Sequence, residues 1–238
     1  MELEGKVALI TGASSGIGAA VASELASAGM KLFLTARRRH RLEERCVQLE
    51  QSAFLAGDLT DSLLPEALLR ETLSQFGRCD VVVNNAGILE VGTIEEIDLD
   101  RLSRMVRINV EGAFRMAYAA LRHFKTRARG HLVNISSILG KKVRPGAGAY
   151  AGTKHALEAL SEALRIELAG SRIAVSCVEP GLVMTELHAH MAVHPAQSFE
   201  IREPLEPEDI ARAVRYVLEQ PDRVHISNLT VLPGQSPL

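Results

Sequence analysis

The sequence K-V-A-L-I-T-G-A-S-S-G-I-G at residues 6–18 predicts the fold of the whole chain. Its first half, residues 6–11, is a short apolar run between two glycines, which is typical of a buried parallel strand. A glycine-rich turn and a helical pattern that ends at Gly29 come directly after it. Strand, glycine turn and helix in this order form the unit that binds the pyrophosphate of a dinucleotide.

Each glycine of the turn meets a requirement that a larger side chain would not. Gly12 permits a tight turn, Gly16 lets the backbone approach a pyrophosphate, and Gly18 lets the helix pack closely on the strand. The helix N-terminus attracts phosphate because its first N–H groups have no partner within the helix. A glycine turn without a ligand is the alternative, but its place between strand and helix favours dinucleotide binding. Three other residues of the turn are expected to contact the cofactor: Ser14, Ser15 and Ile17.

The alternation of strand and helix continues along the chain. It predicts a Rossmann-like, doubly wound parallel α/β sheet of about seven strands with helices on both faces. We find no repeat or linker, so residues 1–238 are expected to form one domain. The further strands are expected at residues 31–36, 52–56, 80–83, 130–135, 173–178 and 226–232, and the further helices at 63–76, 98–124, 149–168 and 207–218.

Composition narrows the class of protein. A hydrophobic fraction of 47% is enough for a large core, and a net charge of -2 gives no general attraction to nucleic acid or anionic lipid. No apolar run approaches the roughly 18 residues that span a bilayer, and the N-terminus lacks a basic region followed by an apolar one. We therefore expect a cytoplasmic protein without nucleic-acid or membrane partners. Its three cysteines are far apart and are expected to be buried as small apolar side chains.

The end of the second strand bears on which dinucleotide binds. A carboxylate about 20 residues after the glycines would hold the ribose 2′-hydroxyl of NAD. Ala36 occupies this position instead, and Arg37 and Arg38 follow it. A guanidinium can clamp a 2′-phosphate with two hydrogen bonds, so the pattern favours NADP(H) over NAD(H). A solvated helix start is the other interpretation, and it accounts best for the basic residues at 39–41.

Residues 134–154 contain side chains suited to acid–base chemistry. Tyr150 and Lys154 are four positions apart, so they share one face if this segment is helical. An ammonium about 5 Å from a phenol, at an effective dielectric of about 20, would lower the phenol pKa by about two units. Ser137, on the loop after an apolar strand, can hydrogen-bond the same reacting oxygen. The alternative is a helix in which Tyr150 and Lys154 have no catalytic role, because the pattern Y-x-x-x-K alone is common by chance.

Taken together, these motifs resemble the short-chain dehydrogenase/reductase family over nearly the whole chain. The glycine spacing is similar to that of its single-domain alcohol and carbonyl oxidoreductases rather than the longer sugar-nucleotide epimerases. The separation of 13 residues between Ser137 and Tyr150 is also the family's usual one. The matching motifs are T-G-x-x-x-G-I-G at 11–18, N-N-A-G at 84–87, Asn109 in a long helix, Ser137, Y-x-x-x-K at 150–154 and P-G-x-x-x-T at 180–185.

The resemblance implies a role for each matching residue. Tyr150 would exchange a proton with the carbonyl or alcohol oxygen, which Ser137 would orient. Lys154 would lower the pKa of Tyr150 and bind the nicotinamide ribose, while Asn109 would hold a water that links Lys154 to solvent. The other implied cofactor contacts are Asp58 and Leu59 with adenine; Asn85, Ala86 and Gly87 with the adenosine ribose and pyrophosphate; and Pro180, Gly181, Val183 and Thr185 with the carboxamide. The resemblance also implies a homodimer or homotetramer, formed through the helices that carry Asn109 and Tyr150.

A lid over the substrate is expected at residues 182–204, and the substrate is expected to be a small aldehyde, ketone or secondary alcohol. Three basic residues between Ser137 and Tyr150 would favour an anionic substrate, although an exposed basic loop is the favoured interpretation: Lys141, Lys142 and Arg144. Three lid histidines lack a fourth metal ligand, so a solvated lid without metal is favoured: His188, His190 and His194. The apolar residues expected to face the substrate are Leu89, Val91, Leu139, Leu182 and Leu187.

The sequence thus predicts an NADP(H)-dependent oxidoreductase that interconverts a carbonyl compound and its alcohol. One alternative is an NAD-dependent alcohol dehydrogenase with the same catalytic residues, against which Ala36 and Arg37 argue. Another is a binding protein that senses NADP(H) without turnover. Loss of catalytic residues would be expected in such a sensor, yet the whole set is present: Asn109, Ser137, Tyr150 and Lys154.

Overall fold

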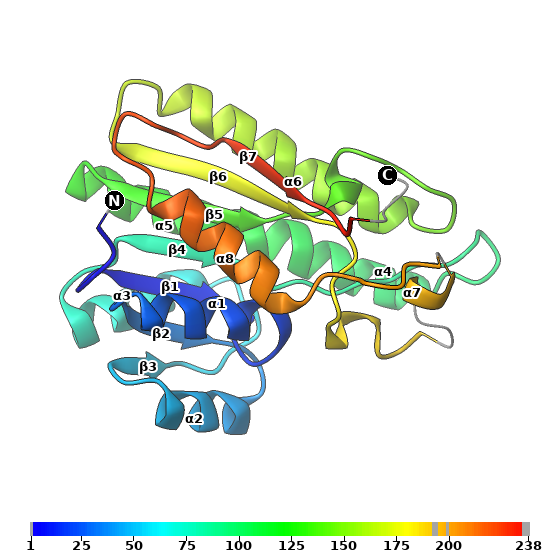
Figure 1. Ribbon diagram of the computed structural model, residues 1–238, viewed down its shortest axis with the longest axis horizontal. Coiled ribbons are helices and arrows are strands. Elements are labelled where there is room, and N and C mark those ends of the chain that lie inside the picture. The colour runs from blue at the N-terminus through cyan, green and yellow to red at the C-terminus, as the bar shows by residue number, and fades with distance from the viewer. Residues whose placement is uncertain (1, 192–194, 199, 235–238) are drawn as a thin grey trace.

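A seven-stranded parallel sheet runs through the middle of the computed structural model, which describes residues 2–191, 195–198 and 200–234 (Figure 1). The strand order is β3-β2-β1-β4-β5-β6-β7. This confirms the predicted doubly wound α/β fold. The strands are β1 (Val7–Thr11), β2 (Lys31–Thr35), β3 (Ser52–Phe54), β4 (Val81–Asn84), β5 (Gly130–Ile135), β6 (Ile173–Pro180) and β7 (Asn228–Val231).

Helices cover both faces of the sheet. On one face lie α1 (Gly16–Ser27), α2 (Arg39–Gln48) and α8 (Pro207–Leu218). On the other lie α3 (Leu64–Phe76), α5 (Ala113–Arg127) and α6 (Gly148–Glu167). The shorter elements are α4 (Leu99–Val106), a π-helical segment η1 (Arg107–Gly112), the 3-10 turns η2 (Ile138–Gly140) and η3 (Glu186–His188), and α7 (Pro195–Ser198).

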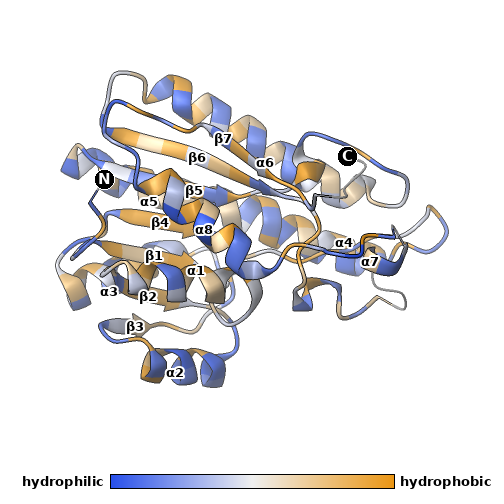
Figure 2. Ribbon diagram, in the orientation of Figure 1, coloured by the Kyte–Doolittle hydropathy of each residue, from blue (hydrophilic) through white to orange (hydrophobic). Residues whose placement is uncertain are grey.

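Each face of the sheet has its own hydrophobic core. Neighbouring strand residues point to opposite faces, so Ile10 packs with the α1 and α8 side chains while Leu9 packs with those of α3 and α5. Phe124 of α5 is fully buried in the second core. Figure 2 shows the hydrophobic strands between helices that carry polar residues as well. Burial on both faces is why the strands read as nearly continuous apolar runs.

The topology creates a crevice beside β1. The chain goes from β1 outward to β2 and β3, and then returns to β4 on the other side of β1. The connections that leave β1 and β4 therefore diverge, and open sheets bind ligands at such a switch point. The glycine turn follows β1, and residues 85–87 follow β4. Two motifs that are far apart in the sequence thus meet at one edge of the sheet.

The predicted long helix at 98–124 is three consecutive helical segments. The Asp98 carboxylate accepts hydrogen bonds from the N–H groups of Asp100 and Arg101, at 2.9 and 3.0 Å, and caps α4. The π-helical turn η1 then separates α4 from α5 and contains Asn109. Such turns often occur at functional sites.

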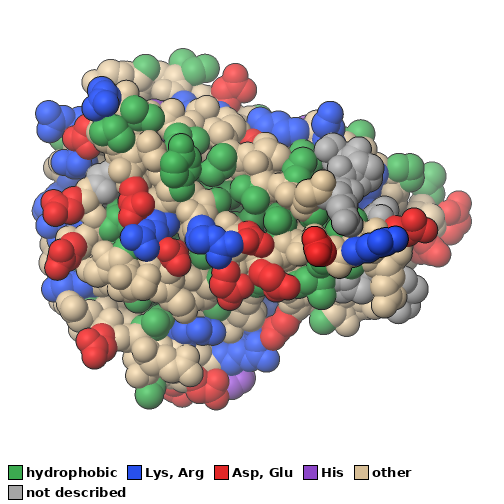
Figure 3. All heavy atoms as spheres, in the orientation of Figure 1, with side chains coloured by type: hydrophobic (Ala, Val, Ile, Leu, Met, Phe, Trp, Pro, Cys, Tyr) green, Lys and Arg blue, Asp and Glu red, His purple; other side chains and the backbone are tan. Residues whose placement is uncertain are grey.

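The surface carries charges of both signs. Figure 3 shows Lys and Arg side chains interspersed with Asp and Glu on the face in view. Among the described residues no helix is long and apolar enough to cross a membrane. Cys79 and Cys177 are buried as predicted, whereas Cys46 is half-buried at the edge of a core.

His131 is expected to make the fold sensitive to acid. It is buried in β5 with its Nε2 atom 2.8 Å from Ser176 Oγ, and burial, reinforced by the charge of His225, lowers its pKa from 6.5 to about 3. Below pH 6.5 the His131 side chain therefore binds a proton in the unfolded chain but not in the folded chain. The free energy of unfolding consequently falls as the pH drops from 6.5 towards 3. Between pH 6.5 and about 4.5 this one group should cost about 2–3 kcal/mol.

Urea unfolding of the wild type and of His131→Gln at neutral and acidic pH checks this prediction. The variant should lose about 2–3 kcal/mol less stability on acidification. His40→Gln, at an exposed position of α2, is the matched control and should behave like the wild type. The same pH dependence in His131→Gln and the wild type would show that another group causes the acid sensitivity.

Candidate active site

A cavity of about 760 Å³ extends along the carboxyl edge of the sheet, from the glycine turn to the lid. Apart from Val91, which is described below, every residue predicted for the cofactor, the substrate or catalysis lines it, except Gly18 and Asn109. These two lie behind the cavity wall and shape it, as their contacts show. The motifs quoted from distant parts of the sequence therefore form one continuous site.

The glycine turn is tied to the segment after β4. The Thr11 hydroxyl accepts hydrogen bonds from the N–H groups of Asn85 and Ala86, both at 3.0 Å, and Asn85 Nδ2 donates to the Thr11 carbonyl at 2.8 Å. Gly12 has a φ of +69°, and a Cβ there would lie 2.7 Å from Asn85 Nδ2. A Cβ at Gly18 would collide with the Gly12 carbonyl. These two glycines are therefore required for the two loops to approach each other.

Ser137, Tyr150 and Lys154 lie together at the inner end of the cavity. Each is buried, with relative exposures of 8%, 8% and 6%. Ser137 caps η2 by accepting the Leu139 N–H at 3.1 Å, and it lies close enough to Tyr150 to act on the pKa of that phenol. Lys154 Nζ lies 5.8 Å from the Tyr150 ring centroid and donates to the Ile135 carbonyl at 2.9 Å. The predicted i, i+4 arrangement on α6 is present.

The expected lowering of the Tyr150 pKa by Lys154 is wrong for this buried pair. Burial raises the pKa of Tyr150 to about 12, and the neighbouring Ser137 hydroxyl opposes this only in part. Burial also lowers the pKa of Lys154 to about 8, so the ammonium is itself disfavoured. An effective dielectric of about 20 describes a pair near the surface, whereas both groups are buried here and desolvation is the larger effect. At neutral pH the phenol consequently keeps its proton.

Asn109 is positioned by the π-helical turn η1. Its side chain accepts the Ile88 N–H at 2.9 Å, and it donates to the Ile88 carbonyl at 2.8 Å and to Thr153 Oγ1 at 3.3 Å. The asparagine therefore holds the segment after β4 against α6. A Cβ at Gly87 would lie 3.3 Å from Asn109 Oδ1 and 3.8 Å from Lys154 Nζ. The glycine keeps this part of the cavity open.

The far end of the cavity is basic. Arg37 is exposed and Arg38 half-buried, and both line the cavity after β2. Arg38 Nη2 donates to Ser14 Oγ at 3.1 Å and to Ser15 Oγ at 2.6 Å, so its guanidinium lies against the glycine turn. Burial alone would raise the pKa of Asp58, but hydrogen bonds from Thr60 and the charges of Arg104 and Arg37 bring this pKa below its usual value.

Apolar side chains line the cavity around Tyr150. Leu139, Leu182 and Leu187, which are expected to face a substrate, are part of this lining, as is Leu89. Val91 does not line it, and packs instead against the adjoining hydrophobic cluster around Tyr150.

Lys141 faces a buried acidic cluster. Its Nζ lies 3.3 Å from Glu158 Oε2 and 3.5 Å from Glu179 Oε1, and Asn228 Nδ2 donates to both carboxylates. The exposures of Glu158 and Glu179 are 6% and 1%. The loop that follows Ser137 is thereby attached to α6 and β6. Sequence reasoning missed this cluster, since nothing in the local pattern around either glutamate indicates a buried partner.

The other basic and histidine residues near the substrate end differ in position. Lys142 is exposed, whereas Arg144 is half-buried and lines the cavity. His188 and His190 line it as well, and His194 lies outside the described residues. Within the described ranges no three His, Cys, Asp or Glu side chains are grouped to hold a metal ion.

Comparison with known proteins places the chain in a family. The model of the family described as short chain dehydrogenase matches residues 6–195. An uncharacterized oxidoreductase of Staphylococcus aureus is 36% identical over 233 residues, which cover 97% of this chain and 98% of that protein.

Solved structures agree with this match. An alcohol dehydrogenase from the archaeon Thermococcus sibiricus, complexed with 5-hydroxy-NADP, superposes with a TM-score of 0.88 at 32% identity, and 98% of this chain and 99% of that one are covered. A 3-ketoacyl-(acyl-carrier-protein) reductase from Brucella melitensis, complexed with NADH, gives a TM-score of 0.90 at 30% identity, with 98% and 99% covered. The chain is therefore an oxidoreductase of the short-chain dehydrogenase family.

Proposed function

We propose that the protein is an NADP(H)-dependent oxidoreductase that interconverts a small aldehyde or ketone and the corresponding alcohol by hydride transfer. The observation that carries this proposal is that the buried residues Ser137, Tyr150 and Lys154 line the same cavity as Arg37 and Arg38. Solved relatives are bound to 5-hydroxy-NADP or NADH, which supports a nicotinamide cofactor of either kind.

The residues of the cavity fit such a cofactor. Glycines at 12, 16 and 87 leave its wall free of side chains, and the start of α1 presents unpaired N–H groups towards it. The guanidinium groups at the far end offer donors to a phosphate. When bound, the nicotinamide group supplies or accepts the hydride.

The protein's own residues supply proton transfer and orientation. In carbonyl reduction the Tyr150 phenol donates its proton to the substrate oxygen, and the Ser137 hydroxyl hydrogen-bonds that oxygen. The buried phenol, whose pKa is raised, carries at neutral pH the proton that reduction requires. Lys154, which is buried one helical turn after Tyr150, helps to orient the reacting groups. The apolar side chains of Leu139, Leu182 and Leu187 line the cavity and limit the entry of water.

The end of β2 favours NADP(H). Proteins specific for NAD have a carboxylate at the end of this strand that binds the ribose 2′-hydroxyl. Here the residue after Thr35 is Ala36, whose small side chain leaves room for a 2′-phosphate. The NAD-dependent alternative requires this pocket to accept a ribose without its phosphate, so that Arg37 would bind no phosphate there. The measured preference between the two cofactors decides between these proposals.

Assembly and location are part of the proposal. Helices α4, α5 and α6 carry large exposed apolar side chains, Leu99, Tyr118 and Ile166, which supports a homodimer or homotetramer formed through these helices. We propose a cytoplasmic location on the basis of the sequence, without nucleic-acid or membrane partners.

Oxidation of NADPH and NADH by the purified protein, followed over a panel of aldehydes, ketones and diketones, tests the function. We expect turnover with NADPH on small, partly apolar carbonyl compounds. Turnover with NADH alone would support the NAD-dependent alternative. Tight NADPH binding without turnover on any member of the panel would favour the non-catalytic sensor.

A further inference from the structure

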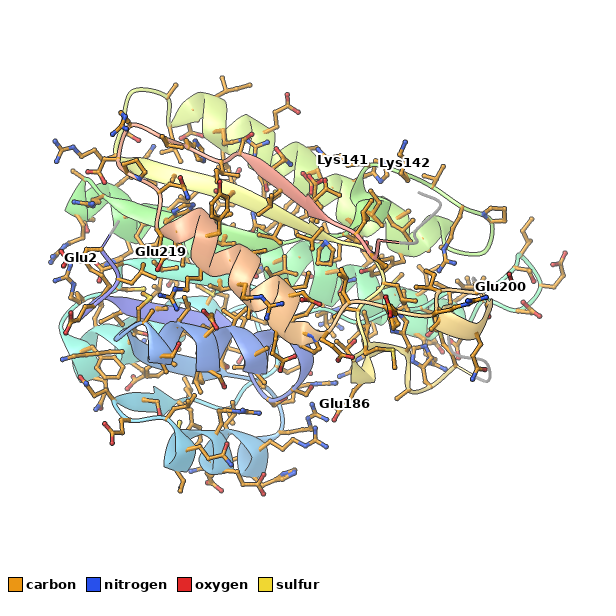
Figure 4. All side chains as sticks on the ribbon, in the orientation of Figure 1. Glu2, Lys141, Lys142, Glu186, Glu200 and Glu219 are labelled. Atoms are coloured by element: carbon orange, nitrogen blue, oxygen red, sulfur yellow. The ribbon has the colours of Figure 1, made fainter. Side chains whose placement is uncertain are left out.

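Glu186 connects the lid to the basic residues that follow β2. It begins the short helix η3, and its Oε2 atom accepts a hydrogen bond from Arg38 Nη1 at 2.6 Å. Its Oε1 atom accepts a second one from Arg41 Nη1. Figure 4 shows Glu186 extending from the lid towards this part of the molecule. One carboxylate from the lid therefore binds two guanidinium groups that come from elsewhere in the chain.

These contacts lie at the end of the cavity that the adenosine half of a dinucleotide would occupy. Arg38, while paired with Glu186, also donates to Ser14 and Ser15 of the glycine turn. Thr185, the residue before Glu186, lies against the same turn, since a Cβ at Gly16 would be 3.1 Å from Thr185 Cγ2. Glu186 lines the cavity together with Arg37 and Arg38. It thus stands next to the guanidinium groups proposed to bind a 2′-phosphate.

A carboxylate and a phosphate are alternative ligands for the same guanidinium. Both offer two oxygens to the fork of an arginine, and both are negatively charged, so they repel each other at close range. The paired guanidinium groups of Arg41 and Arg38 lower the pKa of Glu186 to about 2, so the carboxylate is charged at every pH at which the protein would be assayed. Its charge is therefore always present to oppose a second anion.

We propose that Glu186 is a specificity-determining residue, which competes with the 2′-phosphate of NADP(H) for Arg38 and so reduces the preference of the site for NADP(H) over NAD(H). The proposal rests on the proposed binding of a nicotinamide dinucleotide in this cavity. NADPH must displace Glu186 from Arg38, whereas NADH, which has no 2′-phosphate, leaves the Arg38–Glu186 pair in place.

The test is the affinity of Glu186→Gln for NADPH and for NADH, measured by fluorescence titration of the purified protein. The dissociation constant for NADPH should fall about three- to tenfold, because the competing ion pairs are half-exposed, while that for NADH stays unchanged. Glu200→Gln removes another exposed carboxylate of the lid, outside the cavity lining, and should change neither constant.

Arg38→Ala provides a second variant that separates competition from a change in folding. In an Arg38→Ala background, Glu186→Gln should change the NADPH affinity much less than it does in the wild type. An unchanged ratio of the two affinities in Glu186→Gln, or an equal gain for NADH, would overturn the proposal. The ratio of the NADPH and NADH dissociation constants in the wild type tests the proposed NADP(H) preference. The change in that ratio from the wild type to Glu186→Gln tests the competition. A failure of one proposal can therefore be distinguished from a failure of the other.

Discussion

Replacement of Tyr150 by phenylalanine is expected to lower kcat for carbonyl reduction by about 10²- to 10⁴-fold. The phenol is the group that donates a proton to the developing alkoxide, and Phe has no hydroxyl for this purpose. The ring is buried within the cluster formed by Leu89, Leu139 and Met105, and these packing contacts are retained in the variant. Steady-state kinetics with NADPH, together with a titration of NADPH binding, would check this result.

Cofactor affinity should change little in this variant, because the guanidinium groups and the glycine turn are untouched. Tyr118→Phe is the matched control, since Tyr118 lies on α5 with 44% of its surface exposed and does not line the cavity. It should retain wild-type kcat. A Tyr150→Phe variant with kcat within a few-fold of wild type would rule out the phenol as the proton donor.

Replacement of Arg37 by alanine is expected to weaken NADPH binding about ten- to hundredfold, with little effect on NADH. Hydrogen bonds to charged groups contribute about 1.5–3 kcal/mol, and the 2′-phosphate is the only part of the two cofactors that differs. Arg37 lies two residues after the end of β2 and lines the cavity. Titration of both cofactors against the variant measures the effect.

Arg39→Ala is the matched control for this prediction. Arg39 begins α2, pairs with Glu43 at 2.8 Å and lies over the Phe54 ring, away from the cavity lining. Its loss should affect both cofactors equally and weakly. If Arg37→Ala weakened NADPH and NADH binding to the same extent, the assigned contact with the 2′-phosphate would be wrong.

Much of the fold was predictable from local patterns. Buried parallel strands must be apolar on both faces, so β1, β4 and β5 stand out as short continuous runs. Glycines at 12, 16 and 18 mark the tight turn between β1 and α1, and the spacing of Tyr150 and Lys154 places both on one face of α6. The carboxyl edge of a doubly wound sheet then brings these motifs together.

Features that depend on tertiary contacts were not predictable. The pairing of Glu186 with Arg38 joins residues 148 positions apart, and the Glu158–Lys141–Glu179 cluster joins α6, β6 and the loop after η2. No local pattern encodes such pairs. The pKa of Tyr150 was misjudged for the same reason, since desolvation depends on the whole packed environment rather than on the nearest charge.

Transfer of deuterium from the C4 position of labelled NADPH tests the central claim most directly. Wild-type protein, NADPH in which both C4 hydrogens are replaced by deuterium, and a carbonyl substrate from the panel should give an alcohol with deuterium on its carbinol carbon, detected by mass spectrometry. The rate of its formation should fall about 10²- to 10⁴-fold in Tyr150→Phe. An alcohol formed without deuterium, or formed equally fast by the variant, would contradict hydride transfer assisted by Tyr150.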